Sequence, residues 1–169
     1  MKSVMLSIQP KWCELIANGK KTIEVRKTRP KLETPYKCYI YCTNSKPTIF
    51  VDEHFDGYAI SHKQNGKVIG EFVCDKIQDF SQWENDYPSL LRHINLCAGT
   101  NGDYPFLSGY LGGQKKGYGW HISDLKIYDK PKELSEFKQK VKKCTNGVYY
   151  SVKKPLTRPP QSWCYVEEI

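Results

Sequence analysis

The sequence predicts an α+β fold, a small β-barrel with flanking helices. Most segments with regular hydrophobic spacing are short and alternate polar with apolar residues, as half-buried strands do. Only a few segments show helical spacing, and there is no internal repeat or low-complexity tract. With 169 residues, the chain is predicted to form a single domain, residues 1–169, with an insertion at about 81–116.

The first predicted elements are a strand at residues 3–8 and a helix at residues 10–18. Proline suits the first turn of a helix, so Pro10 is a plausible start. Gly19 stands where a helix needs a left-handed terminating residue. These two signals bound the helix at both ends.

After Gly19 the hydrophobic period changes from about 3.6 to about 2, which predicts a strand. Ile23 and Val25 then point to one side, and Glu24 and Arg26 point to the other. Thr22 shares the polar side, and Lys20 and Lys21 precede the strand. Pattern alone favours an edge strand with a solvated charged face.

The following elements are predicted from the same periods. Residues 28–36 contain two prolines and should form a loop, and residues 37–43 should form a strand. Residues 44–66 are polar and predicted to be irregular. A long strand is expected at residues 66–77, interrupted at Gly70 by a bulge, with Glu71 directly after it.

The second half of the chain contains the predicted insertion and the last strands. Helical spacing predicts helices at residues 89–98 and 103–111, inside the insertion, and a third helix at 131–141. Strands are predicted at residues 119–128, 148–152 and 163–166.

Charge is concentrated in two blocks of the chain. Residues 1–31 hold eight basic and two acidic residues, and residues 126–158 hold ten basic and three acidic residues. If the fold brings these blocks together, they would form a basic surface suited to phosphates. The alternative is a lysine-rich surface that only aids solubility. Tyrosines and tryptophans are interleaved with the basic residues, which favours nucleic-acid binding over this alternative.

Composition also limits the classes to which this protein can belong. The seven cysteines have no metal-binding spacing and are expected to be free thiols, and no metal or cofactor is predicted. No signal peptide and no apolar run long enough to span a membrane is visible. We therefore expect a soluble, cytoplasmic protein.

One motif resembles a known family. The pattern Gly-x-Lys-x-x-Glu-x-Arg, formed by Gly19, Lys21, Glu24 and Arg26, resembles the signature of the ASCH domain family in the PUA-like superfamily. The C-terminal stretch 158–166 is similar to the ending of longer ASCH proteins of bacteria and their phages, including prophages. The resemblance covers residues 3–43, 66–80, 117–137 and 156–168, and is absent from 81–116.

The resemblance implies a PUA-like barrel with a basic cleft built on Lys21, Glu24 and Arg26. Its partner would be single-stranded RNA or one modified nucleotide. Arg26 would offer a planar fork of donors to a phosphate. Glu24 would either hold the two cations in place or accept a hydrogen bond from the amine of a base. The residues predicted to bind ligand are Lys20, Lys21, Thr22, Glu24, Arg26, Glu71 and Trp163.

A second hypothesis is a hydrolase. Some small bacterial ASCH proteins are similar amidohydrolases that deacetylate acetylated cytidine with a lysine, a threonine and a glutamate. This chain keeps the lysine as Lys21, but Glu24 stands where those enzymes have the threonine, and a carboxylate cannot replace an activated hydroxyl. Thr22 lies about 6.8 Å away along the strand.

A ribonuclease is also chemically consistent with the motif, with Lys21 and Glu24 as the catalytic acid–base pair and Arg26 stabilising the phosphorane. A third hypothesis is a protein-interaction domain whose charge is incidental. The sequence alone leaves open whether the protein is an enzyme or a binder.

Overall fold

The computed structural model describes residues 2–55, 58–82, 93–94, 96–99, 109–111 and 116–169. Its contacts divide the chain into two compact units. The first unit contains residues 1–10, 37–71 and 126–169, and the second contains residues 11–36 and 72–125. Each unit is described by itself below.

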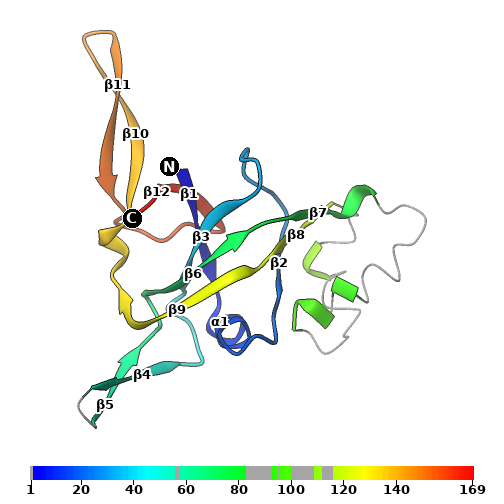
Figure 1. Ribbon diagram of the computed structural model, residues 1–169. Coiled ribbons are helices and arrows are strands. Elements are labelled where there is room, and N and C mark those ends of the chain that lie inside the picture. Colours follow the sequence, from blue (N-terminus) through cyan, green and yellow to red (C-terminus); the bar gives the residue numbers. More distant parts are fainter. Residues whose placement is uncertain (1, 56–57, 83–92, 95, 100–108, 112–115) are drawn as a thin grey trace. The chain divides into compact units, whose positions relative to one another are not determined.

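The first unit is built on a five-stranded sheet with the order β12-β1-β3-β6-β9 (Figure 1). Its strands are β12 (Trp163–Glu167), β1 (Lys2–Ile8), β3 (Tyr36–Cys42), β6 (Val68–Cys74) and β9 (Ser123–Lys132). Strand β1 pairs antiparallel with β12 and parallel with β3. The last residues of β6 and the first of β9 belong to the second unit.

Burial on both sides explains the apolar composition of the central strands. All residues of β1 after Lys2 are buried, and Cys38, Ile40 and Cys42 of β3 have no exposed surface. The core of this unit contains Met5, Tyr39, Tyr41, Val68, Phe137, Leu156 and Val166. Cys38 and Cys42 thus serve as small apolar core residues.

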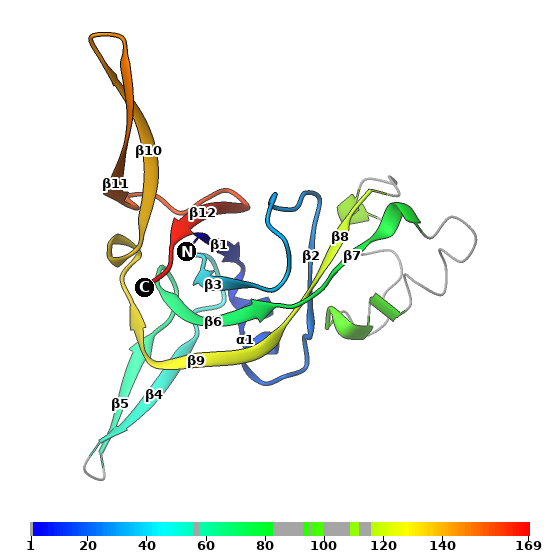
Figure 2. The ribbon, with the colours of Figure 1, turned by 45° about the horizontal axis from the view of Figure 1, so that its top comes forward.

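Two β-hairpins also belong to the first unit (Figures 1 and 2). One joins β4 (Phe50–Phe55) to β5 (Tyr58–Lys63), and the other joins β10 (Lys138–Thr145) to β11 (Val148–Pro155). A short 3₁₀-helix, η2 (Leu134–Glu136), precedes β10.

The second unit contains α1 (Pro10–Ala17) from Lys11 onward and a three-stranded antiparallel sheet with the order β2-β8-β7. The strands are β2 (Ile23–Arg26), β8 (Tyr118–His121) and β7 (Ile77–Asp79), and β7 is followed by the 3₁₀-helix η1 (Phe80–Gln82). The core consists of Ile23, Val25, Phe80, Ile94, Ala98 and Leu111. The side of β2 that carries Ile23 and Val25 therefore faces this core.

The fold is α+β and mainly β, as predicted. The described strands form four sheets, and none of these closes into a barrel. The helix at residues 10–18 and the strands predicted at residues 3–8, 37–43, 148–152 and 163–166 are confirmed within a few residues. The strand predicted at 119–128 is divided between β8 and β9.

Two predictions of secondary structure are wrong. Residues 44–66, predicted to be irregular, contain the β4–β5 hairpin. Residues 131–141, predicted to be helical, contain the end of β9, η2 and the start of β10. In both cases long-range strand pairing, which local spacing does not reveal, decides the conformation.

The helices predicted in the insertion lie mainly outside the described residues. Within residues 89–98, the described residues 93–94 and 96–97 are helical, as are residues 109–111. The long strand predicted at residues 66–77 is β6, and β7 follows it after a short break. At Gly70 a Cβ atom would lie 2.5 Å from the carbonyl oxygen of Lys126, so the glycine permits close approach of the β9 backbone.

Candidate functional site

The turn after α1 places the signature residues. Gly19 has a φ of 73°, the left-handed conformation predicted for the residue that ends the helix. Its amide donates to the carbonyl of Ile16, and the amide of Lys21 donates to the carbonyl of Leu15 at 2.9 Å. These bonds satisfy carbonyls at the helix end, so the chain leaves α1 in one fixed direction and enters β2.

The three charged residues of the motif form a continuous ionic triad. Nζ of Lys21 lies 3.2 Å from Oε2 of Glu24, and Nη2 of Arg26 lies 3.0 Å from Oε1 of the same carboxylate. Glu24 therefore uses one oxygen for each cation. The structure thus brings together the three residues on which the sequence-based hypothesis rests.

The triad is buried, which the strand pattern did not predict. The exposed fraction is 5% for Lys21, 7% for Glu24 and 7% for Arg26. The interpretation of this side of β2 as a solvated charged face is wrong. At such burial, each charge requires partners, because an unpaired charge away from water costs several kcal/mol, on the order of 3–5.

Lys21 has all of its donors engaged. Besides Glu24, its ammonium donates to the carbonyl of Ile23 at 2.8 Å and to the carbonyl of Ala98 at 3.3 Å. An ammonium has three N–H donors, so these three acceptors complete its hydrogen bonding. Lys21 thus holds β2 against residue 98 and positions Glu24.

Aromatic residues surround the triad. Nζ of Lys21 lies 5.4 Å from the ring centre of Trp12, which is half-buried on α1. In the β2–β8 pair, Glu24 is directly opposite Trp120 and Arg26 is opposite Tyr118, so these side chains share a face. Trp120 is fully buried and packs edge-on against Tyr36.

Tyr110 is a further neighbour of the triad. Burial raises the pKa of its hydroxyl, while the charge of Arg26 lowers it and that of Glu24 raises it. Its side chain retains an exposed fraction of 39%, and Nζ of Lys27 lies 5.5 Å from its ring centre. The guanidinium carbon of Arg29 lies 5.7 Å from the ring centre of Tyr118.

Sequence reasoning missed Tyr110, Tyr118 and Trp120 as neighbours of the triad. Tyr118 and Trp120 reach the triad through the register of β2 on β8, across more than ninety residues of sequence, which spacing does not encode. The alternation of residues 118–121 was the available signal, because it predicts a strand whose aromatic residues share one face.

Lys20 and Thr22, also predicted to bind ligand, are both exposed. The backbone of Thr22 is fixed, because its amide donates to the carbonyl of Cys97 and its carbonyl accepts from Ile122. The role of Lys20 and Thr22 as ligand contacts stays a prediction.

Glu71 and Trp163, the remaining predicted residues, belong to the first unit. Glu71 accepts a hydrogen bond from the hydroxyl of Tyr128 at 2.6 Å and lies 3.4 Å from Nζ of Lys37. Trp163 packs edge-on against Tyr165, with 5.4 Å between ring centres. Their contacts to a ligand held at Lys21 stay a prediction, as does the cleft itself.

The seven cysteines are free, as expected. Within the described residues, no cluster of histidine, cysteine and acidic side chains could hold a metal ion. The described helices include none that is long and apolar enough to cross a membrane.

Comparison with known proteins identifies a domain family whose match includes the residues of the triad. The model of the ASCH domain matches residues 6–132. A serine-to-alanine mutant of ZmASCH from Zymomonas mobilis is similar in structure, with a TM-score of 0.61 at 17% identity, over 98% of this chain and 89% of that chain. The ASCH crystal structure from Zymomonas mobilis gives a TM-score of 0.52 at 16% identity, over 98% and 88%. No curated protein sequence matches.

Proposed function

Because this chain belongs to the ASCH domain family, we propose that it binds single-stranded RNA or a modified nucleotide at the Lys21–Glu24–Arg26 triad. The observation that carries the proposal is the buried chain of contacts from Lys21 through Glu24 to Arg26. These are the positions of the motif on which the family resemblance rests.

The energetics of the triad favour a functional role over a purely stabilising one. Well-packed apolar residues of similar volume often stabilise a protein as much as a buried ion pair or triad does. A chain that keeps three charges at this depth therefore gains something other than stability. The triad itself carries two cations and one anion, so its own net charge favours an anionic ligand.

We assign a separate task to each member. Lys21 anchors the site, because its ammonium is engaged by two carbonyls and by Glu24. Glu24 orients Arg26, and Arg26 presents its planar fork of donors to a phosphate or to a base edge. Tyr118 and Tyr110 supply aromatic surface near Arg26 on which an unpaired base could stack.

The geometry favours binding over hydrolysis of acetylated cytidine. A general base needs an uncharged amine with a free lone pair, whereas the amine of Lys21 is placed to donate to three acceptors. Thr22 is exposed and is separated from the buried carboxylate of Glu24 by one residue. Hydrolysis at this site would require Lys21 to leave its present contacts.

One experiment separates the two functions. Purified protein is mixed with a short single-stranded RNA containing acetylated cytidine, and both binding and product mass are followed over time. We expect binding without a change in mass, and loss of binding in Arg26→Ala. The matched control is Arg158→Ala, which removes an exposed arginine of the first unit and should bind as the wild type does.

Two other outcomes are informative. Deacetylation or strand cleavage that disappears in Lys21→Ala would show an enzyme that depends on Lys21 and would overturn the proposal that the site only binds. Absence of both binding and turnover with the folded wild-type protein would overturn the proposal in favour of a protein-interaction domain.

A further inference from the structure

The β10–β11 hairpin carries a second concentration of positive charge. Residues 138–155 contain six lysines and no acidic residue. The strands are joined by Asn146 and Gly147, whose φ values of 50° and 78° form the two-residue turn that matches strand twist. The hairpin extends away from the five-stranded sheet of the first unit (Figures 1 and 2).

The outer half of this hairpin is exposed on both faces. Beyond the pair Val141–Val152, every residue of both strands is exposed. The exposed fraction reaches 77% for Tyr149 and 66% for Val148. An isolated two-stranded ribbon is marginally stable in water, so this extension contributes little to the core and is better explained by a partner.

Strand register places three lysines of β10 and Tyr149 on one face. Lys138, Lys140 and Lys142 alternate along β10 and therefore point to the same side, about 6.8 Å from one to the next. Tyr149 lies opposite Cys144 on that side. A row of cations at this interval is comparable with consecutive phosphates of an extended nucleic-acid strand.

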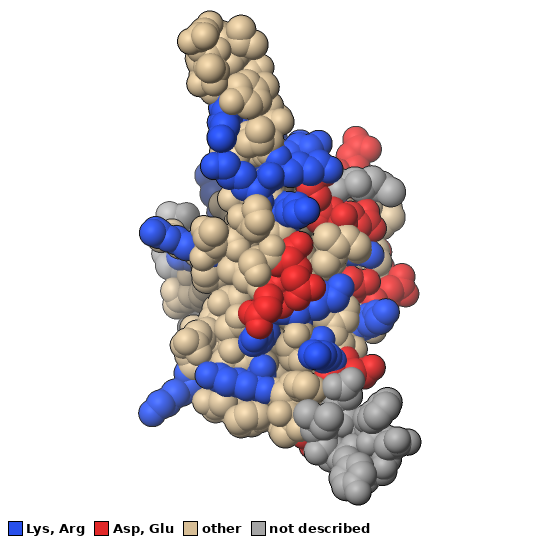
Figure 3. Space-filling view, turned by 90° about the vertical axis from the view of Figure 1, so that its left-hand side faces the viewer, with Lys and Arg blue, Asp and Glu red and all other residues tan. Residues whose placement is uncertain are grey.

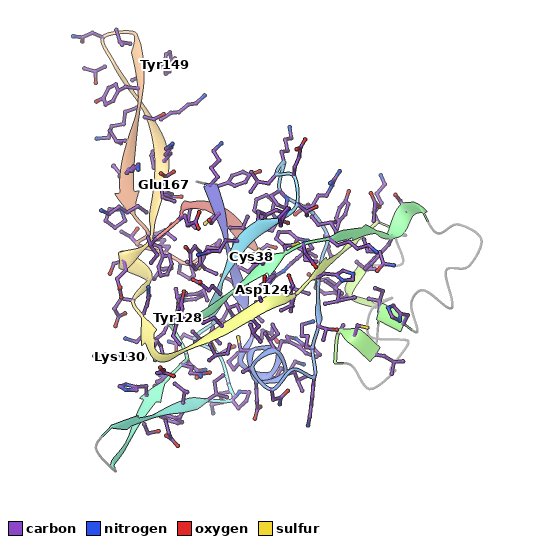
Figure 4. The ribbon with its side chains drawn as sticks, viewed as in Figure 1. Cys38, Asp124, Tyr128, Lys130, Tyr149 and Glu167 are labelled. Atoms are coloured by element: carbon purple, nitrogen blue, oxygen red, sulfur yellow. The ribbon has the colours of Figure 1, made fainter. Side chains whose placement is uncertain are left out.

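Glu167 of β12 divides the hairpin into a neutralised base and a basic outer half. It lies 2.9 Å from Nζ of Lys153 and 3.6 Å from Nζ of Lys140, which face each other across the strands. Figure 4 places Glu167 at the base and Tyr149 near the tip. Figure 3 shows lysine and arginine atoms gathered below an uncharged tip.

The outer half also contains a shaped surface. Lys142, Tyr149, Tyr150 and Ser151 line an open hollow on the hairpin. In the described part of the chain no carboxylate is in ion-pair contact with Lys142. The hollow therefore combines an uncompensated ammonium, an exposed aromatic ring and a hydroxyl.

We propose that this hairpin is a second contact surface for single-stranded RNA, with Lys142 on a phosphate and Tyr149 stacked on an unpaired base. The inference rests on the proposed function for its choice of RNA, but it uses residues separate from the triad. Stacking of bases on exposed aromatic side chains next to cations is how single strands are bound without sequence preference.

Single-stranded RNA fits this surface better than a duplex does. Bases of a duplex are stacked inside it, so they leave no ring face for Tyr149, and the major groove of an RNA helix is too narrow for side chains to read. The uncharged tip is small and includes the polar residues Thr145 and Asn146, which disfavours insertion into a lipid surface.

The test compares full-length variants for binding to labelled oligouridine at several salt concentrations. We expect Tyr149→Ala to weaken binding about 5- to 100-fold and Tyr149→Phe to retain it, because phenylalanine keeps the ring. Lys142→Ala should weaken binding and reduce the salt slope by about 0.7, the value for one lost phosphate contact.

The matched control is Lys63→Ala, which removes the same charge from an exposed position elsewhere in the first unit. The affinity of this control for oligouridine should stay much closer to that of the wild type than the affinities of Tyr149→Ala and the lysine variant do. Circular dichroism of each variant verifies that the protein is folded.

The other outcomes distinguish failure of the hairpin inference from failure of the proposed function. If Arg26→Ala loses binding while all hairpin variants bind as the wild type does, the hairpin inference is wrong and the proposed function stands. If the hairpin variants lose binding only to duplex RNA or to phosphatidylserine vesicles, the partner is not single-stranded RNA. If the wild type binds no RNA, both proposals are overturned.

Discussion

Lys21 and Glu24 form a salt bridge of 3.2 Å between side chains that are almost completely buried. Lys21 lies in the connection after α1 and Glu24 lies in β2, so the pair ties this connection to the strand. Because the other oxygen of Glu24 contacts Arg26 at 3.0 Å, the position of the guanidinium depends on the same carboxylate. Glu24 is thus the centre of the site.

Replacing Glu24 with glutamine should destabilise the protein strongly. The amide keeps the shape of the side chain, but Lys21 and Arg26 lose the charge that they share. Removing one partner from a buried ion pair costs about 3–5 kcal/mol in the free energy of unfolding. Urea unfolding measures this, and Glu33→Gln, at an exposed position, should change stability by less than about 0.5 kcal/mol. Equal midpoints for the two variants would contradict the assigned role of Glu24.

The contacts of Glu71 predict a pH dependence of stability. Burial raises the pKa of Glu71, but the hydrogen bond from Tyr128 and the charge of Lys37 outweigh it, so the pKa lies below its usual value. A carboxyl group with a lowered folded-state pKa contributes stability above its unfolded-state pKa and loses it as pH falls. Wild-type stability should therefore decrease below the ordinary glutamate range.

The variant Tyr128→Phe isolates this effect. It removes the hydrogen bond to Glu71, so it should lower the free energy of unfolding at neutral pH by about 1.5–3 kcal/mol. The difference from wild type should shrink at acidic pH, where the carboxylate is protonated. Chemical denaturation across this range measures it, and a difference independent of pH would show that packing alone is responsible.

The stability of the turn between β10 and β11 should depend on the backbone conformation of Gly147 and not on side-chain contacts at this position. Gly147 has a φ of 78°, and a Cβ atom there would meet no other atom within 4 Å. Gly147→Val should therefore destabilise the hairpin by about 1–2 kcal/mol through strain, whereas Gly147→Asn should be tolerated better. Amide hydrogen exchange of residues 142–151 reports local opening, and equal exchange in both variants would contradict this explanation.

Gly70 should be intolerant of any side chain for a different reason. A Cβ atom at this position would lie 2.5 Å from the carbonyl oxygen of Lys126, and a backbone neighbour cannot rotate away. Gly70→Ala should cost about 1–3 kcal/mol or more through overpacking. Gly109, whose Cβ position is open, is the matched control. A thermal midpoint unaffected by Gly70→Ala would show that β9 can shift outward.

The sequence predicted the first elements well because their signals are local. Pro10 starts α1, Gly19 ends it in the left-handed conformation, and alternation predicts β1, β2 and β3. The same local reasoning failed at residues 131–141, where Leu134, Phe137 and Val141 have spacing that also suits a helix. The Asn146–Gly147 turn was the stronger signal, since it indicates a hairpin between two strands.

The candidate site was predicted by its charged residues but not by its environment. Alternation placed Glu24 and Arg26 on a shared face and the family resemblance added Lys21, and the structure places the three in contact. Their burial depends on partners far along the chain, such as the carbonyl of Ala98 and the rings on β8. Local patterns do not contain this information, so a solvated face was the simpler interpretation.

The most direct test of RNA binding at the triad is the salt dependence of RNA affinity for the wild type and for Arg26→Gln. For the wild type, we predict that the logarithm of affinity falls linearly with that of salt concentration. Arg26→Gln, folded as shown by circular dichroism, should bind more weakly with a slope smaller by about 0.7, one phosphate contact. Arg158→Gln should keep the wild-type slope. An Arg26→Gln protein with wild-type affinity and slope would contradict the central claim that the buried triad presents Arg26 to RNA.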